Sequence, residues 1–202
     1  SWRHGAVVIG EDLGTVPEGL RERLEAAGIL GMRVLWFERD AEGGFLAPVH
    51  WTRQAVAMTT THDLPTVTGW WAGRDIDWRR RLGLFPDPAA AERAQQERAR
   101  DRIALWQAMC RSGAAAGAAP EPDDPPLDAA LRHVGAAASA LALLPLEDAC
   151  ALAEQPNLPG TVEGHPNWRR RLPGEAAGLL DDAGTRARLA AFATTRQARE
   201  RC

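Results

Sequence analysis

The stretch that decides the fold is GAVVIGEDLGTVPEGLRERLEAAGILGMRVLWF, residues 5–37. It opens with the apolar run 6–9, and an uninterrupted run of this kind is typical of a parallel strand that is buried on both faces. Thr15 and Glu18 then match a capping box, which marks the start of a helix. A second apolar strand is predicted over 32–37. The stretch therefore predicts a β-α-β unit, in which a helix joins two parallel strands.

Further strands and helices alternate along the rest of the chain. The pattern predicts strands over 55–60 and 140–146, and helices over 87–112, 127–134 and 181–199. Four strands that alternate with helices indicate a parallel α/β architecture. Two stretches rich in Pro and Gly interrupt the pattern. We expect 113–126 to be an exposed, flexible loop and 154–173 to be a structured loop.

The overall composition excludes several classes of protein. The 202 residues are 45% hydrophobic and 25% charged, which is an ordinary globular mixture and argues against wholesale disorder. No apolar run reaches the roughly 20 residues of a membrane span, so no membrane partner is expected. We do not expect the N-terminal residues to be a signal peptide, because their short apolar run leads directly into charges.

The cysteines and the sequence motifs bear on location and cofactors. Cys110, Cys150 and Cys202 are odd in number and far apart, so they predict neither a disulfide framework nor a zinc site. This use of cysteine fits a reducing, cytoplasmic location. The sequence contains no glycine-rich nucleotide fingerprint, no P-loop and no HExxH zinc motif, and we therefore expect neither a metal nor an organic cofactor.

Acidic residues follow three of the predicted strands. The pairs concerned are Glu11-Asp12, His62-Asp63 and Glu147-Asp148. In a (β/α)8 barrel, the active site lies at the carboxyl ends of the strands. A carboxyl group in that position can protonate a leaving oxygen, and a carboxylate beside a histidine can bind neighbouring sugar hydroxyls and stabilise an oxocarbenium ion. Three acidic strand ends therefore predict a cleft, and two carboxylates about 5–5.5 Å apart within it would indicate retaining glycoside chemistry.

Each of these pairs also has a structural interpretation. Glu11 or Asp12 could instead stabilise the start of the following helix. His62 and Asp63 could instead form a helix cap with a satisfied histidine. The residues alone leave both interpretations open.

A five-residue run, WRRRL, occurs twice, at 78–82 and at 168–172. A tryptophan followed by three arginines could stack on bases and contact phosphates. The alternative is a packed tryptophan with solvated arginines. The formal net charge of −3 and the absence of a wider basic stripe favour this alternative, so no nucleic-acid partner is expected.

Six segments of the chain, taken in order, resemble successive motifs of one enzyme family. They are residues 9–17 (IGEDLGTVP), 31–37 (GMRVLWF), 61–66 (THDLPT), 144–148 (LPLED), 156–163 (PNLPGTVE) and 165–172 (HPNWRRRL). The family is that of the 4-α-glucanotransferases, the amylomaltases or disproportionating enzymes of bacteria and plants. The resemblance spans about residues 5–173, and the ordered set of motifs is far more specific than any one of them.

The resemblance implies a fold and a reaction. The family fold is a (β/α)8 barrel of the α-amylase clan, so the expected fold class is α/β, the C-terminal half of a (β/α)8 TIM-type barrel with helical and loop insertions. The four predicted strands would be its fifth to eighth, and residues 1–202 would be the C-terminal part of the catalytic domain. The implied reaction is the retaining transfer of α-1,4-glucan segments between maltooligosaccharides, without a cofactor.

The resemblance also implies roles for individual residues. Glu11 matches the general acid/base, Asp63 the carboxylate that stabilises the transition state, and His62 the adjacent histidine that binds hydroxyls. Three further sets match substrate-binding positions: Phe37 near the donor sugars, and Asn157 and Pro159-Gly160 on the acceptor-side loop 154–173.

One family feature is missing from the sequence. The family nucleophile is an Asp in an Arg-x-Asp-His motif on the fourth strand, and neither residues 74–78 nor Arg3-His4 fit that motif. We therefore expect this chain to be a fragment that is inactive alone and that either self-associates through open sheet edges or rearranges. The alternatives are an α-1,4-glucan hydrolase of the same clan and a non-catalytic glucan-binding fragment.

Overall fold

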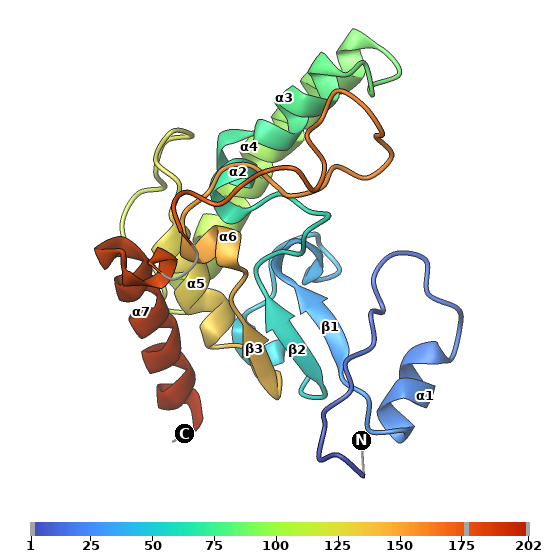
Figure 1. Cartoon of the computed structure of the whole chain (residues 1–202), viewed down its shortest axis with the longest axis vertical. Helices are drawn as coiled ribbons and strands as arrows, with labels where there is room; N and C mark the ends of the chain where they lie inside the picture. The colour runs from blue at the N-terminus through green and yellow to red at the C-terminus, as the bar shows by residue number, and fades with distance from the viewer. Residues whose placement is uncertain (1–2, 176–177, 201–202) are drawn as a thin grey trace.

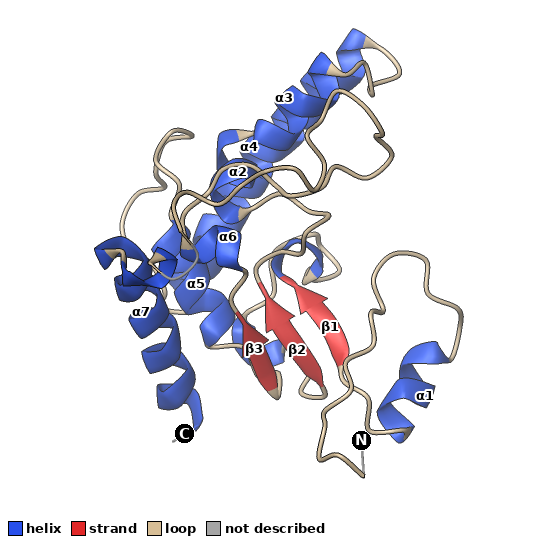
Figure 2. Cartoon of the chain, in the orientation of Figure 1, coloured by secondary structure: helices blue, strands red, loops and turns tan. Residues whose placement is uncertain are grey.

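A three-stranded parallel sheet lies at the centre of the computed structural model, which describes residues 3–175 and 178–200 (Figures 1 and 2). The strands are β1 (Gly31–Val34), β2 (Ala55–Met58) and β3 (Leu141–Leu143), in the order β1-β2-β3. Every residue of the central strand β2 is buried. Because a central parallel strand is covered on both faces, this burial matches its continuous apolar sequence.

Helices and short 3-10 turns fill the connections. In chain order they are α1 (Leu20–Ala26), η1 (Leu35–Phe37), η2 (Pro48–His50), α2 (Val67–Ala72), α3 (Arg74–Arg81), α4 (Pro88–Arg111), α5 (Leu127–Gly135), α6 (Leu146–Ala149), η3 (Leu179–Asp181) and α7 (Ala183–Glu200). The helix α1 lies apart, beyond the β1 edge of the sheet, whereas α5 and α7 pack together on the β3 side (Figure 2). The chain is therefore an α/β protein with a small parallel sheet.

The first predicted strand is reduced to a single bridge. Ile9 pairs in parallel with Leu30, and the rest of the run 6–9 lies outside any strand. Val7, Val8 and Ile9 are exposed. A parallel strand of this composition needs a neighbour on each side, and within the described residues this run has a partner only on the β1 side. The prediction of a full strand over 6–9 is therefore wrong.

The first helix begins four residues later than the capping box predicts. It starts at Leu20, preceded by Gly19 in the left-handed conformation (φ 76°), and no side chain caps it. Gly14 also has a positive φ, so the chain turns twice before the helix can begin. The capping box between Thr15 and Glu18 is therefore not the start of the helix.

Two helices in the connection after β2 escape the sequence patterns. Thr66 caps α2 by accepting a hydrogen bond from Gly69 N (3.0 Å). Gly73, in the left-handed conformation (φ 79°), ends α2 and begins α3. By contrast, α4 follows its prediction closely, since the Asp87 carboxylate accepts from Ala90 N at 2.7 Å and Pro88 occupies the first turn.

Aromatic stacking joins the end of β1 to the long helix α4. Trp36 stacks on Trp70 with 4.6 Å between ring centroids, and Phe45 meets Trp70 edge-on. The Arg98 guanidinium of α4 lies over the Trp70 ring at 4.4 Å and binds both oxygens of Asp75 at 2.8 Å. These contacts fix the helices α2, α3 and α4 against the carboxyl end of the sheet.

The remaining sequence predictions concern loops, cysteines and membrane segments. The loop 113–126 contains no helix or strand. Two indole N–H groups donate hydrogen bonds to its carbonyls, Trp71 to Glu121 (2.9 Å) and Trp106 to Gly117 (3.1 Å). Cys110 and Cys150 are free thiols, while Cys202 lies outside the described residues. Across the described part of the chain, no helix has the length and hydrophobicity to cross a bilayer.

Candidate active site

Asp148 is completely buried where the ends of β2 and β3 meet. Its carboxylate accepts hydrogen bonds from the Thr59 hydroxyl and from Val67 N (2.8 Å), so it links α6 to the end of β2 and the start of α2. Burial raises the pKa of Asp148 to about 6, although these two hydrogen bonds oppose the rise. Since both oxygens are occupied and shielded from solvent, Asp148 braces the fold and is closed to a ligand.

Asp12 plays the same part at the first acidic strand end. It is buried, and its carboxylate accepts from Met32 N (2.7 Å), Arg33 Nη1 (2.9 Å) and Arg21 Nε (3.1 Å). Burial favours a raised pKa, but the Met32 amide and the two guanidinium groups outweigh it, so the pKa of Asp12 lies below its ordinary value. Asp12 therefore holds the turn against β1. It contacts α1 through the Arg21 side chain, and among the described residues it accepts no hydrogen bond from the amides at the start of that helix.

The two glutamates beside these buried aspartates are oriented differently. Glu11 is exposed, and its carboxylate forms no hydrogen bond with the described residues. Glu147 is half-buried and lines a pocket. In each Glu-Asp pair the aspartate is therefore used by the fold, and the glutamate is left available for other contacts.

His62 and Asp63 form an open cluster with Asn157 beyond the end of β2. The His62 Nε2 lies 3.4 Å from Asp63 Oδ1, and Asn157 donates to the same oxygen at 2.7 Å. The Asn157 backbone N also donates to the His62 carbonyl at 3.0 Å. Both His62 and Asp63 side chains are about half exposed. Because Thr66 is the residue that caps α2, the interpretation of this pair as a helix cap is wrong.

Gln155 is a supporting residue that sequence reasoning missed. It is buried, and its Nε2 donates to the Asn157 carbonyl (2.6 Å) and, at 3.4 Å, to the Asp63 carbonyl. It therefore fixes the backbone on both sides of the Asp63–Asn157 hydrogen bond. Only its position two residues before Asn157 could have indicated this role.

The loop 154–173 is held in shape by Asn167. Its Oδ1 accepts from Leu158 N (2.9 Å) and lies 2.5 Å from His165 Nδ1, while its Nδ2 donates to the Thr161 carbonyl (2.9 Å). These bonds explain how a stretch without helix or strand keeps a defined course. The hydrogen bonds of Asn167 therefore hold the two sides of this loop together.

The other predicted substrate-binding residues lie apart from the His62–Asp63 pair. Phe37 ends η1 beyond β1 and is exposed. Pro159 and Gly160 are exposed at a turn of the loop 154–173, where Gly160 has a φ of 79°. Within the described chain, no hydrogen bond or ion pair joins these three residues to His62 or Asp63. The structure therefore brings Asn157 to the pair, and among the described residues it leaves Glu11, Phe37, Pro159 and Gly160 without a hydrogen bond or ion pair to it.

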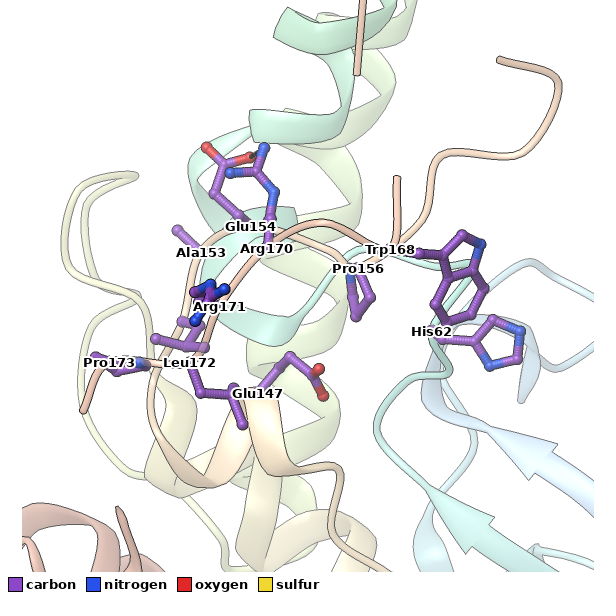
Figure 3. Close-up of a pocket in the computed structure, with 11 residues that line it drawn as sticks. His62, Glu147, Ala153, Glu154, Pro156, Trp168, Arg170, Arg171, Leu172 and Pro173 are labelled. Carbon is purple, nitrogen blue, oxygen red and sulfur yellow. Dashed lines mark hydrogen bonds and ion pairs between the residues drawn. The ribbon is translucent and has the colours of Figure 1, made fainter. Parts of the chain in front are cut away.

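A pocket of about 640 Å³ opens beside His62 (Figure 3). Its wall is formed by the end of β2, by α6 and by the loop 154–173. The lining residues are His62, Glu147, Leu152, Ala153, Glu154, Pro156, Trp168, Arg170, Arg171, Leu172 and Pro173. Figure 3 shows His62 and Trp168 together on one side and Glu147 on another, with its carboxylate directed toward the hollow.

The two WRRRL runs have different structures. In the first, Trp78 belongs to α3, donates to Glu154 Oε2 (2.7 Å) and meets His165 edge-on. Glu154 also binds Arg74 (2.6 Å) and Arg170 (2.9 Å), so it ties the two runs together. In the second run, Trp168 lies in a loop and is exposed. The runs are therefore not copies of one structural unit, and Glu154 already pairs with Arg170.

The groups that converge here are a carboxylate, an imidazole and an amide, with an exposed aromatic ring nearby. These groups bind neutral hydroxyls by donating and accepting hydrogen bonds, and the ring offers an apolar face. Among the residues with described positions, no cluster of three or more His, Cys, Asp or Glu side chains could hold a metal ion. The arrangement is thus suited to binding a polyhydroxyl ligand such as a sugar.

Comparisons of sequence point to one family. The family profile of 4-alpha-glucanotransferase matches residues 1–177. A 4-alpha-glucanotransferase of Mycobacterium tuberculosis is 39% identical over 198 residues, which are 95% of this chain and 27% of the relative. One of Thermus thermophilus is 33% identical over 94% of this chain and 33% of the relative. The chain thus spans between a quarter and a third of the length of these relatives.

Comparisons of structure agree with this result. The amylomaltase of Corynebacterium glutamicum superposes with a TM-score of 0.81 at 27% identity, over 95% of this chain and 29% of its own. The amylomaltase of Streptococcus agalactiae in complex with acarbose superposes with a TM-score of 0.61 at 20% identity, over 96% and 33%, and shows the shared fold alone. Taken with the family profile, these likenesses establish that the chain belongs to the 4-α-glucanotransferase family.

Proposed function

We propose that this chain is part of a 4-α-glucanotransferase that transfers α-1,4-glucan segments between maltooligosaccharides with retention of configuration. The observation that carries the proposal is the open cluster of His62, Asp63 and Asn157 at the carboxyl end of β2. Its residues belong to two motifs that resemble those of the family, and the family itself is established by sequence. A half-exposed carboxylate held by an amide and next to an imidazole is suited to binding adjacent sugar hydroxyls.

The strands of this chain are, on this proposal, the fifth to eighth of a (β/α)8 barrel. Two observations support it. The Ile9 bridge, β1, β2 and β3 neighbour one another in sequence order and in parallel, as consecutive barrel strands do. In addition, apolar side chains are exposed at both edges of the sheet, Val7 to Ile9 at one and Leu141 and Leu143 at the other. The remaining strands of the barrel would cover these residues.

The chemistry then proceeds in two steps. Glu11 donates its proton to the glycosidic oxygen as a carboxylate nucleophile from elsewhere in the enzyme attacks the anomeric carbon, so the glycosidic bond breaks and a glycosyl ester forms. Glu11, now ionised, removes the proton from the 4-hydroxyl of an acceptor sugar. That hydroxyl attacks the anomeric carbon, and the carboxylate nucleophile leaves.

Asp63 and His62 act on the sugar at which the bond is cleaved. The Asp63 carboxylate and the His62 imidazole bind its 2- and 3-hydroxyls most tightly when the ring flattens in the transition state. Asn157 holds the Asp63 carboxylate in place through the 2.7 Å hydrogen bond. Phe37 contacts donor sugars, while Pro159 and Gly160 border the acceptor and favour sugar over water as the attacking group.

The exposure of Glu11 has a consequence for the isolated chain. A general acid has to meet the glycosidic oxygen in a site from which water is excluded, and Glu11 is exposed in this chain. We therefore propose that the rest of the barrel covers Glu11, that the isolated chain is inactive, and that it self-associates through its exposed apolar edges. Light scattering at several concentrations of the isolated chain measures the self-association, and a constant monomer mass would contradict it.

Replacing Glu11 tests the proposal. In the complete enzyme, Glu11→Gln should lower the rate of maltotriose disproportionation by about 10²–10⁴-fold, because the amide cannot transfer a proton. Glu18→Gln, a charge-matched change in the following turn, should leave the rate within about twofold, as is usual for surface substitutions. Product analysis completes the test, since longer oligosaccharides indicate transfer. Growth of reducing ends without longer products would show a hydrolase instead, and an unimpaired Glu11→Gln enzyme would refute the role of Glu11.

A further inference from the structure

Trp168 differs from the other tryptophans within the described ranges. It is the only exposed one, with 65% of its surface accessible, whereas the others are buried or half-buried. Its backbone is also unusual, because φ is +58°, in the left-handed region that bulky residues rarely occupy. Strained backbone of this kind persists only where its surroundings hold it, and it is concentrated at binding sites.

The surroundings of Trp168 fix its ring in place. Its backbone N donates to the Pro156 carbonyl at 3.0 Å, and the preceding Asn167 is the residue that organises the loop. The indole lies 5.0 Å from the His62 ring, tilted by 46°. Two residues further on, Arg170 is tied to Glu154. The backbone that carries the ring is therefore fixed, and the ring already lies beside His62 before a ligand binds, which lowers the entropy lost on binding.

The chemistry around the ring favours a neutral sugar. The pocket offers apolar side chains such as Pro156 and Leu172, and Glu147 supplies a carboxylate that accepts hydrogen bonds from hydroxyls. A flat aromatic face packs well against the C–H face of a pyranose ring. The lining carries two carboxylates, Glu147 and Glu154, and two guanidinium groups, Arg170 and Arg171, and Arg170 is paired with Glu154. These charges balance, so the lining does not select an anionic ligand.

The position of the pocket assigns it to the acceptor. The pocket lies between the end of β2 and α6, and Trp168 lies beside His62 in its wall. No residue of the 5–37 segment, which carries Glu11 and Phe37, contributes to this lining. A glucan that passes the His62–Asp63 pair would therefore have its donor part over β1 and its acceptor part in this pocket.

We propose that Trp168 is the stacking platform for a glucosyl residue of the acceptor, and that Glu147 accepts a hydrogen bond from a hydroxyl of the same sugar. This inference rests on the proposed function and assigns a specificity-determining residue to it. Trp168 thereby determines how tightly the enzyme holds the acceptor, and how well sugar competes with water for the glycosyl-enzyme.

Three substitutions separate stacking from the other roles that the ring could have. In the complete enzyme, Trp168→Ala removes the ring, Trp168→Phe keeps an aromatic face, and Trp168→Gly removes the ring while suiting the left-handed backbone. Ile103→Ala is the control, because Ile103 is an exposed apolar residue on α4, outside the pocket. The measurements are kcat and the acceptor KM with a fixed donor, and the affinity for maltotriose by calorimetry.

We expect the acceptor KM to rise about tenfold or more in both Trp168→Ala and Trp168→Gly, and about threefold or less in Trp168→Phe. The loss in kcat at saturating acceptor should be smaller than the change in KM. A normal KM in Trp168→Gly would assign the residue a backbone role and overturn the inference. A fall in kcat with an unchanged KM would show that the ring only positions His62, and would also overturn it.

The calorimetry keeps this inference distinct from the proposed function. If the complete enzyme binds maltotriose through Trp168 but transfers no glucan, the platform is supported and the proposed function fails. If transfer is normal and the loss of Trp168 changes neither KM nor affinity, the platform is refuted and the proposed function stands. An enzyme that neither transfers glucan nor binds maltotriose would refute both.

Discussion

Asp63 and Asp148 follow neighbouring parallel strands, yet their surroundings are opposite. Asp63 has a side chain that is 43% exposed, and Asn157 is the described residue that donates to its carboxylate. Asp148 is 0% exposed and binds Thr59 and Val67. An acidic residue at the end of a strand can therefore either stabilise the fold or bind a ligand. The outcome depends on whether hydrogen-bond donors of the protein already bind both oxygens of the carboxylate.

The charge of Asp63 gives the largest expected effect. Asp63→Asn keeps an oxygen for the Asn157 amide but loses the negative charge that, on the proposed function, stabilises the transition state. In the complete enzyme it should lower the rate of maltotriose disproportionation by about 10²–10³-fold, without a marked change in melting temperature. The comparison variant Asp148→Asn, whose amide can serve both Thr59 and Val67, should keep most of its activity. Equal losses of activity in the two variants would contradict the division between them.

The loss of stability should be larger for a substitution of Asp148 than for one of Asp63, the reverse of the order expected for activity. Asp148→Ala leaves the Val67 N–H and the Thr59 hydroxyl buried without an acceptor and creates a small void. It should lower the free energy of unfolding by about 2–4 kcal/mol, whereas Asp63→Ala at the open site should cost less than about 1 kcal/mol. Urea unfolding measures both values. A larger loss for Asp63→Ala would mean that the open cluster also holds the fold together.

The pH dependence of stability sharpens the comparison further. Burial raises the pKa of Asp148 to about 6, above its ordinary value of 3.8, so the folded protein retains a proton that the unfolded chain releases. Its stabilising contribution is therefore fully present below about pH 4 and is lost as the pH rises to about 6. Relative to Asp148→Asn, the unaltered protein should lose on the order of 2 kcal/mol across this range. Unfolding curves that run parallel for the two proteins between pH 4 and 6 would contradict this account.

The sequence predicted elements best where one short-range signal determines the structure. The long helix α4 follows its prediction because Asp87 caps it and Pro88 fits its first turn. The central strand β2 follows its prediction because an apolar run buried on both faces has few alternatives. The run at 6–9 is equally apolar, but within the described chain it has a neighbouring strand on one side alone. A parallel strand of this kind forms only where its neighbours are present, and the local sequence does not show them.

The site was predicted less completely, because exposure depends on tertiary contacts. Neighbouring acidic residues such as Glu147 and Asp148 look equivalent in a sequence, and their difference arises from Thr59 and Val67, about 80–90 positions away. Trp78 and Trp168 begin identical five-residue runs, yet the first is packed in α3 and the second is exposed in a loop. No local pattern distinguishes these cases, and the left-handed backbone of Trp168 has no signal in the sequence.

We propose that the carboxyl groups of Glu11 and Asp63, which follow different strands, line one cavity that is large enough for a sugar ring. The structure of the complete enzyme bound to a maltooligosaccharide tests it most directly. We predict that the Glu11 carboxyl group lies within hydrogen-bond distance of the glycosidic oxygen, and that Asp63 binds hydroxyls of the sugar on its donor side. A glucan bound elsewhere, or Glu11 and Asp63 on opposite sides of the molecule, would contradict the claim.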